Sequence, residues 1–247
     1  MDKFFKAIAA TLCSISFLAS ATEITLSASN DFLLKGDYFS SNQASNYSVL
    51  MLHQCNYNRS MYADIGQQLS QRGINALSLD FRGFGDSVSE EFNIDNIQQL
   101  PQPERRKAWR AMAKYWPDDV LLAYKFLQSK LVDSGKIAVI GASCGGSQAI
   151  TLAENQPIAA LGFFSSAQRD ENIAKYAQSL AKKPTLIIVA EQDVRTFVSG
   201  NKLFEKAQHQ QSKLIAYKGD EHGYPLLDKD PHLAETIVNW LEKQLKK

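Results

Sequence analysis

The sequence predicts an α/β protein with a doubly wound, mostly parallel sheet. Two observations carry this prediction. Short segments that are apolar on both faces recur along the chain, as in parallel strands covered by helices, and amphipathic helical patterns separate them. At 247 residues, with 45% hydrophobic and 21% charged content, the chain is long enough to form one domain with a large core.

The elements follow one another from residue 23 onwards. Segments 23–29 and 31–39 alternate between polar and apolar residues, which predicts an antiparallel hairpin. The apolar runs expected as core strands are 47–54, 74–81, 136–143, 158–164, 184–193 and 212–219. The helical patterns are 59–73, 118–131, 145–156 and 232–247. Together, residues 22–247 are expected to form a single α/β domain.

Residues 88–116 interrupt this alternation. The segment is longer than a typical connection and carries Phe92, Trp109, Tyr115 and Trp116. It follows the carboxyl end of a predicted strand, where α/β sheets place their ligand crevice. We therefore expect a small helical cap that forms part of the substrate pocket. The alternative is an insertion whose aromatic residues only pack onto the sheet.

The first 21 residues have the pattern of a secretory signal peptide. Lys3 and Lys6 precede an apolar run, and Ala19-Ser20-Ala21 is a small-residue cleavage site. A buried first helix or a membrane anchor are alternatives, but the run is shorter than the roughly 20 residues that span a bilayer. The pattern predicts cleavage after Ala21, a periplasmic or secreted protein, and no stable membrane insertion after cleavage.

The charge balance argues against polyanionic partners. The chain has 27 basic and 26 acidic residues, and removal of Asp2, Lys3 and Lys6 with the signal leaves 25 of each, a formal net charge of zero. A nucleic-acid-binding protein would present a dense basic surface, and no Lys/Arg cluster of that density occurs outside the signal. We expect no nucleic-acid partner.

The sequence Gly-Ala-Ser-Cys-Gly at 141–145 fits a G-x-S-x-G motif between a predicted strand and a predicted helix. In such a tight turn the central residue projects above the sheet at a helix N-terminus. Ser143 is therefore the candidate nucleophile, and the backbone N–H of Cys144 is a candidate oxyanion donor. Cys144 as nucleophile is the weaker alternative, because the thiol lies one residue past the apex. A nucleotide-binding turn is disfavoured because no G-x-G-x-x-G or Walker lysine is present.

A serine nucleophile needs a histidine base that is oriented by a carboxylate. His222 lies in the loop between the last predicted strand and the last helix, whereas His209 and His232 are expected at ordinary helical surface positions and His53 ends a strand. Asp193 follows a predicted strand and is the preferred acid. Glu191 is a weaker candidate, and Asp220 and Glu221 are too close to His222 in sequence.

From about residue 47 to the C-terminus, the sequence resembles the α/β-hydrolase superfamily. The resemblance rests on the segment 49–87, which ends in Asp-Phe-Arg-Gly-Phe-Gly-Asp-Ser, and on the order Ser143, Asp193, His222. It is similar to the dienelactone-hydrolase-like and esterase branches, which implies a sheet of the α/β-hydrolase type and an oxyanion hole near Gln54 and Cys55. Gln54 stands where the family usually has glycine, and Cys55 N–H is the expected second donor.

These features predict an exported serine hydrolase that cleaves carboxylic esters or related small acyl substrates, with no cofactor and no metal. Peptidase or thioesterase action on the same triad is an alternative, because the fold does not define the leaving group. A catalytically silent binding protein is another. Cys55 and Cys144 are expected as two separate buried thiols, with a disulfide between the two segments as the alternative.

Overall fold

A computed structural model describes residues 21–247, so the predicted signal peptide lies almost entirely outside the described residues. The described residues form one mostly parallel eight-stranded sheet in the order β1-β2-β4-β3-β5-β6-β7-β8. The strands are β1 (Thr22–Ser27), β2 (Leu33–Phe39), β3 (Ser45–Leu52), β4 (Asn75–Leu79), β5 (Leu131–Ala142), β6 (Leu161–Phe164), β7 (Thr185–Ala190) and β8 (Lys213–Tyr217). The predicted α/β class and the early hairpin are confirmed, since β1 pairs antiparallel with β2.

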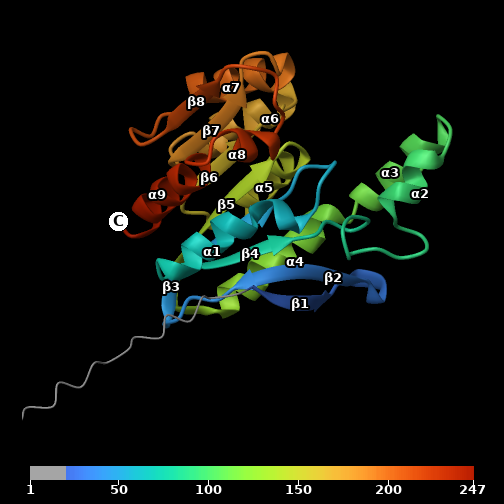
Figure 1. The fold of residues 1–247 in the computed structure, drawn as a ribbon, viewed down its shortest axis with the longest axis horizontal. Helices are drawn as coiled ribbons and strands as arrows, with labels where there is room; N and C mark the ends of the chain where they lie inside the picture. Colours follow the sequence, from blue (N-terminus) through green and yellow to red (C-terminus); the bar gives the residue numbers. More distant parts are fainter. Residues whose placement is uncertain (1–20) are drawn as a thin grey trace, which may run out of the picture.

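Helices cover both faces of the sheet (Figure 1). They are α1 (Ala63–Gln71), α2 (Ile94–Gln99), α3 (Glu104–Ala113), α4 (Trp116–Ser129), α5 (Cys144–Asn155), α6 (Asp170–Lys175), α7 (Val194–Lys206), α8 (Pro225–Lys229) and α9 (Leu233–Leu245). Helices α1, α8 and α9 bury their apolar residues in one core cluster, and α4 to α7 contribute to the other. In α9, Leu233, Ile237, Leu241 and Leu245 recur every four residues and are all fully buried, the apolar stripe of a helix that packs on a sheet.

The insertion at 88–116 forms α2 and α3, which stand away from the sheet in Figure 1. Its aromatic residues pack inwards: Phe92 and Trp116 are buried, and Trp109 and Trp116 both contact Phe84 edge to face. Aromatic pairs of this kind add to the stability that burial alone provides. They hold the insertion against the loop that follows β4.

Arg82, in the Arg-Gly-Phe-Gly stretch after β4, anchors this region from inside. Its guanidinium is fully buried and donates to both carboxylate oxygens of Asp119, at 3.0 and 2.8 Å. The same group lies 4.2 Å from the ring centroids of both Phe32 and Tyr115. A buried cation needs such a bidentate partner to offset the loss of its hydration. One residue of the motif thus ties the hairpin, the insertion and α4 together.

Candidate active site

The candidate residues come together at the carboxyl edge of the parallel strands. Ser143 follows β5, Asp193 lies beyond β7, His222 lies beyond β8, and Gln54 and Cys55 follow β3. Parallel strands bring their carboxyl ends to one edge of a sheet, which is where ligands bind in this class of fold. A cavity of about 320 Å³ at this edge is lined by Ser143, Asp193 and His222.

Ser143 occupies a strained turn between β5 and α5, with φ 49° and ψ −114°. Non-glycine residues rarely adopt this conformation, and it is typical of functional turns. Gly141 and Gly145, which flank this serine, allow the turn to pack closely against itself and against β3. A Cβ atom on Gly141 would lie 2.3 Å from the Gly145 backbone, and one on Gly145 would lie 2.4 Å from the Leu52 carbonyl oxygen. Any larger side chain would therefore push the turn away from β3.

Two hydrogen bonds hold the backbone of this turn, and a third holds one of the donors. Ser143 N donates to Phe164 O at 2.9 Å, Ser166 Oγ donates to Ser143 O at 2.5 Å, and Gln168 Nε2 donates to Ser166 Oγ at 2.6 Å. Ser166 and Gln168 are both buried. Neither residue could be selected from the sequence, because serine and glutamine after a strand are typical of any polar loop.

His222 and Asp193 form a close pair. His222 Nδ1 lies 2.6 Å from Asp193 Oδ2, and Thr196 Oγ1 donates to the same carboxylate oxygen at 2.7 Å. With Nδ1 protonated, Nε2 is left as the acceptor that a base requires. Within residues 21–247, no direct hydrogen bond joins the Ser143 hydroxyl to His222; such contacts often form only when substrate is bound. Thr196, which no sequence pattern singled out, orients Asp193, the predicted acid.

The competing carboxylates have other partners. Glu191 forms an ion pair with Lys218 at 2.6 Å, and Glu221 forms one with Lys229 at 2.5 Å. In both ion pairs the lysine is exposed to solvent. Asp193 is therefore the carboxylate that contacts the His222 ring.

The other histidines have different environments. His53 is fully buried, its Nδ1 donates to Gln54 O at 2.7 Å, and its Nε2 accepts from Phe81 N at 3.0 Å. Burial lowers the pKa of His53 to about 4, so the ring stays neutral and links two loops. His209 lies just after α7 rather than inside a helix, and His232 directly precedes α9.

Cys55 and Cys144 form a disulfide with a Cα–Cα distance of 5.8 Å. The expectation of two separate thiols is therefore wrong. The reason is the register of the two central strands: Leu52 of β3 lies opposite Gly141 of β5, and each cysteine follows its paired residue by three positions. This register places the two Cβ atoms side by side. The spacing of the cysteines along the sequence contains no information about the register.

Gln54 has a buried side chain that reaches the loop carrying His222. Its Oε1 accepts from Tyr224 N at 2.8 Å, and its Nε2 donates to His222 O at 3.4 Å and to Asn56 Oδ1 at 2.8 Å. A Cβ atom on Gly223 would lie 1.8 Å from Gln54 Oε1. The side chain therefore connects the β3 loop to the His222 loop, a contact that the prediction of an oxyanion-hole role for Gln54 did not include.

The insertion does not line the cavity that holds Ser143. Its residues Ile94, Asp95 and Gln98 instead line a second cavity of about 530 Å³, together with Cys55 and Phe84 among others. The first cavity includes Cys144 and the second includes Cys55, so the disulfide joins the walls of the two. The insertion therefore lines this second cavity, and its aromatic residues mainly pack it in place. Its part in the substrate pocket stays a prediction.

Comparison with known proteins identifies the family. The profile of the serine aminopeptidase S33 family matches residues 43–222, most of the described chain. The chain belongs to this family of α/β hydrolases. It is therefore a hydrolase, and the predicted relationship to the α/β-hydrolase superfamily is confirmed. No protein with a curated description matches the chain significantly.

Solved structures with this fold include several esterases. The esterase Pf2001 of Pyrococcus furiosus is 17% identical with a TM-score of 0.67, over 92% of this chain and 93% of that one. A dienelactone hydrolase from Anabaena variabilis is 21% identical with a TM-score of 0.61, over 92% and 99%. A carboxyl esterase from Bacillus coagulans is 11% identical with a TM-score of 0.67, over 92% and 99%. At these identities the similarity demonstrates the shared fold.

No helix among residues 21–247 is long and apolar enough to cross a membrane. In the same range, no three His, Cys, Asp or Glu side chains are grouped as metal ligands would be.

The Gln54 contact can be tested in this hydrolase by Gln54→Ala, which frees the His222 loop from the β3 loop. Displacement of His222, the predicted base, by about 1 Å is expected to lower kcat by about 10- to 100-fold with little change in KM. Asn56→Ala is the control, because it removes a partner of Gln54 that does not belong to the His222 loop. Steady-state kinetics on both variants provide the measurement, and an unchanged kcat in Gln54→Ala would contradict the positioning role.

The disulfide predicts that denatured, unreduced protein lacking residues 1–21 contains no free thiol. Reduction should lower kcat while the protein remains folded, because the bridge joins the loop after β3 to the first residue of α5. It should also cost about 2 to 4 kcal/mol of unfolding free energy, a typical value for a bridge that closes a long loop. Thiol titration, urea unfolding and kinetics with and without reductant measure these effects. Full kcat in reduced, folded protein would show that the bridge does not hold the site.

Proposed function

We propose that this chain is an exported serine hydrolase that cleaves carboxylic esters of small molecules. One observation carries the proposal: Ser143, in a strained turn at a helix N-terminus, lines one cavity with His222, whose Nδ1 lies 2.6 Å from Asp193. Acyl transfer requires a nucleophile, a base and an acid that orients the base. Here the three candidates surround one space that is large enough for a small acyl group.

In this mechanism Ser143 Oγ attacks the ester carbonyl carbon while His222 Nε2 accepts the serine proton. Asp193, held by Thr196, keeps the proton on Nδ1 and stabilises the imidazolium that forms. His222 then gives the proton to the leaving alcohol. The same base activates a water molecule, which hydrolyses the acyl-enzyme and releases the carboxylic acid. Each step uses the tautomer that the His222–Asp193 contact favours.

The tetrahedral intermediate carries a negative charge on the former carbonyl oxygen. Cys144 is the first residue of α5, and the first N–H groups of a helix lack intrahelical partners. We assign Cys144 N–H as one oxyanion donor and Cys55 N–H as the second, since the disulfide fixes the two segments together. One such donor is usually worth about 10²- to 10³-fold in rate.

The charge near the site supports an ester substrate over an aminopeptidase substrate, although the matched family is named for a serine aminopeptidase. Aminopeptidases must accept a free ammonium group close to the scissile bond. Arg195 lines the same cavity as Ser143, and the only carboxylate among that cavity's described lining residues, Asp193, is engaged by His222. A cation at this position repels an ammonium group. The esterases and dienelactone hydrolase with the same fold are consistent with this choice.

The proposed nucleophile is tested by Ser143→Ala. Loss of a serine nucleophile typically lowers kcat by about 10⁶-fold, so hydrolysis of p-nitrophenyl acetate and labelling by a fluorophosphonate should both disappear. Ser129→Ala, at the exposed end of α4, is the control and should behave like the wild type. Thermal unfolding should show that both variants are folded. Fluorophosphonate labelling of folded Ser143→Ala at the wild-type rate would reject the assignment.

Export is supported by the signal-like residues 1–21 and by a disulfide, a bond rare in reducing compartments. Expressed in a Gram-negative host with its own N-terminus, the protein is expected in the periplasmic fraction or the medium, beginning at Thr22. N-terminal sequencing of fractionated protein gives the answer, and an intact Met1 in the cytosolic fraction would overturn the proposal.

A further inference from the structure

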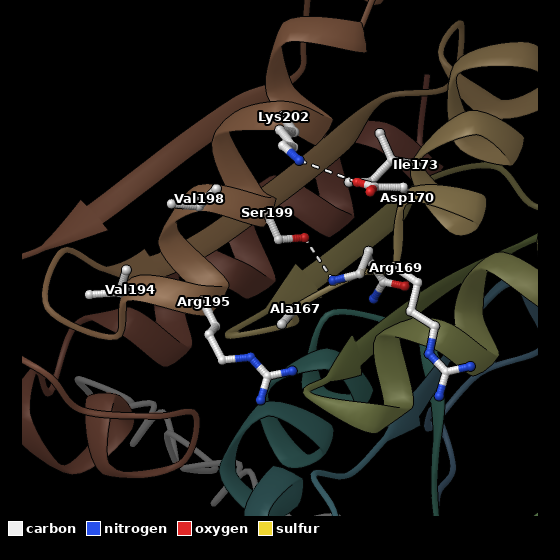
Figure 2. Close-up of a pocket in the computed structure, with 10 residues that line it drawn as sticks. Ala167, Arg169, Asp170, Ile173, Val194, Arg195, Val198, Ser199 and Lys202 are labelled. Atoms are coloured by element: carbon white, nitrogen blue, oxygen red, sulfur yellow. Dashed lines mark hydrogen bonds and ion pairs between the residues drawn. The ribbon is translucent and has the colours of Figure 1, made fainter.

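A cavity of about 430 Å³, whose lining residues are drawn in Figure 2, adjoins the one that contains Ser143. The two share Ala167 and Arg195 among their lining residues. The remaining walls come from the loop after β6, from α6 and from the first three turns of α7. A substrate whose ester lies at Ser143 can therefore extend into this neighbouring space without passing through the protein.

Two arginines line this cavity: Arg195 lines the Ser143 cavity as well, whereas Arg169 is not among the residues that line the Ser143 cavity. Figure 2 shows the guanidinium groups of Arg169 and Arg195 along one edge, with Lys202 at the opposite end. Lys202 is paired with Asp170 at 3.2 Å. Within the described part of the chain, neither Arg169 nor Arg195 takes part in an ion pair. Among the described carboxylates, none therefore pairs with either of these two positive charges of the cavity.

The backbones that carry these arginines are fixed to each other. Gln168 N donates to Ser199 Oγ of α7 at 2.7 Å, and the Gln168 side chain contacts Ser166, Ser147 and Asn172. Arg195 lies in the first turn of α7, where the helix dipole adds positive potential. The spacing of the two arginine backbones is thus set before a ligand binds, which lowers the entropic cost of binding.

The rest of the cavity is partly apolar. Val194 and Val198 are 63% and 48% exposed on α7, and Ile173 of α6 lines the facing wall. Large aliphatic side chains exposed in this way next to a catalytic cavity favour contact with methylene groups of a ligand.

We propose that Arg169 and Arg195 bind an anionic group of the substrate, so that the substrate class is an ester that carries a second, negatively charged group. The planar guanidinium fork matches a carboxylate or a phosphate, and the apolar wall accommodates the short chain between that group and the ester. This inference rests on the proposed ester hydrolysis at Ser143, and it makes Arg169 and Arg195 specificity residues of that reaction.

The test compares matched substrates with and without the charge. The p-nitrophenyl monoesters of glutaric, adipic and suberic acids are each paired with the neutral p-nitrophenyl ester of the same diacid methylated at the far carboxyl. We expect kcat/KM to favour the charged member of the best pair by about tenfold, because an exposed ion pair contributes up to about fivefold and two arginines act together. The preference should shrink as salt is raised from low ionic strength to 1 M, where such pairs are screened.

Variants separate the arginines from general effects of charge. Arg195→Gln and Arg169→Gln should each lower kcat/KM on the charged ester by up to about fivefold relative to the matched neutral ester, and Arg195→Lys should keep part of the preference. Arg110→Gln is the matched control, since Arg110 is an exposed arginine on α3. An equal loss on charged and neutral esters, or an equal loss in Arg110→Gln, would overturn the proposal.

A second arm identifies the anion. Inorganic phosphate and glutarate are tested as competitive inhibitors of neutral ester hydrolysis, in the wild type and in Arg195→Gln. If glutarate inhibits more strongly than phosphate, and does so in the wild type but not in Arg195→Gln, the bound anion is a carboxylate. If phosphate inhibits more strongly than glutarate with the same dependence on Arg195, the bound anion is a phosphate. If the wild type hydrolyses neutral esters and shows no preference for their charged partners, this inference is rejected and the proposed esterase activity stands. If no ester is hydrolysed in a Ser143-dependent way, the proposed function itself is rejected.

Discussion

The register between β3 and β5 is the constraint on which the rest of the site depends. With Leu52 opposite Gly141, the chain leaves both strands at the same height and must turn in opposite directions within a few ångströms. Only glycine at 141 and 145 permits this approach, and the turn forces Ser143 into its strained backbone. The disulfide and the close contact between the β3 loop and α5 are consequences of the same pairing.

The loops around this edge are fixed by buried polar side chains rather than by apolar packing. Gln54 holds the His222 loop, while Ser165 Oγ accepts from Gly223 N on the other side of that loop. Ser166 and Gln168 hold the turn of Ser143. Such directional contacts fix atomic positions more closely than dispersion does, and a catalytic geometry must hold to within a fraction of an ångström. The cost of burying these groups is offset because their polar atoms have partners.

The layered fold could be predicted because each core strand is apolar on both faces and each covering helix has a clear stripe, as in α9. Ser143, Asp193 and His222 could be selected because each follows an apolar run. The disulfide, the side-chain role of Gln54 and the supports Thr196, Ser166 and Gln168 could not. They depend on which residues face one another across separate strands, and a polar residue in a loop has no periodicity that reveals its partner. For the same reason, the sequence could not show which cavity the segment 88–116 lines.

The bridge between Cys55 and Cys144 has a chemical consequence for the neighbouring position. Serine and cysteine both serve as nucleophiles in turns of this type, yet here residue 143 is bonded directly to a half-cystine. A thiolate at 143 would lie next to an electrophilic sulfur and could undergo thiol–disulfide exchange with it, which would scramble the bridge and consume the attacking group. An alkoxide does not enter that exchange. The oxygen nucleophile and the disulfide are therefore compatible neighbours, and a sulfur nucleophile would require the bridge to be absent.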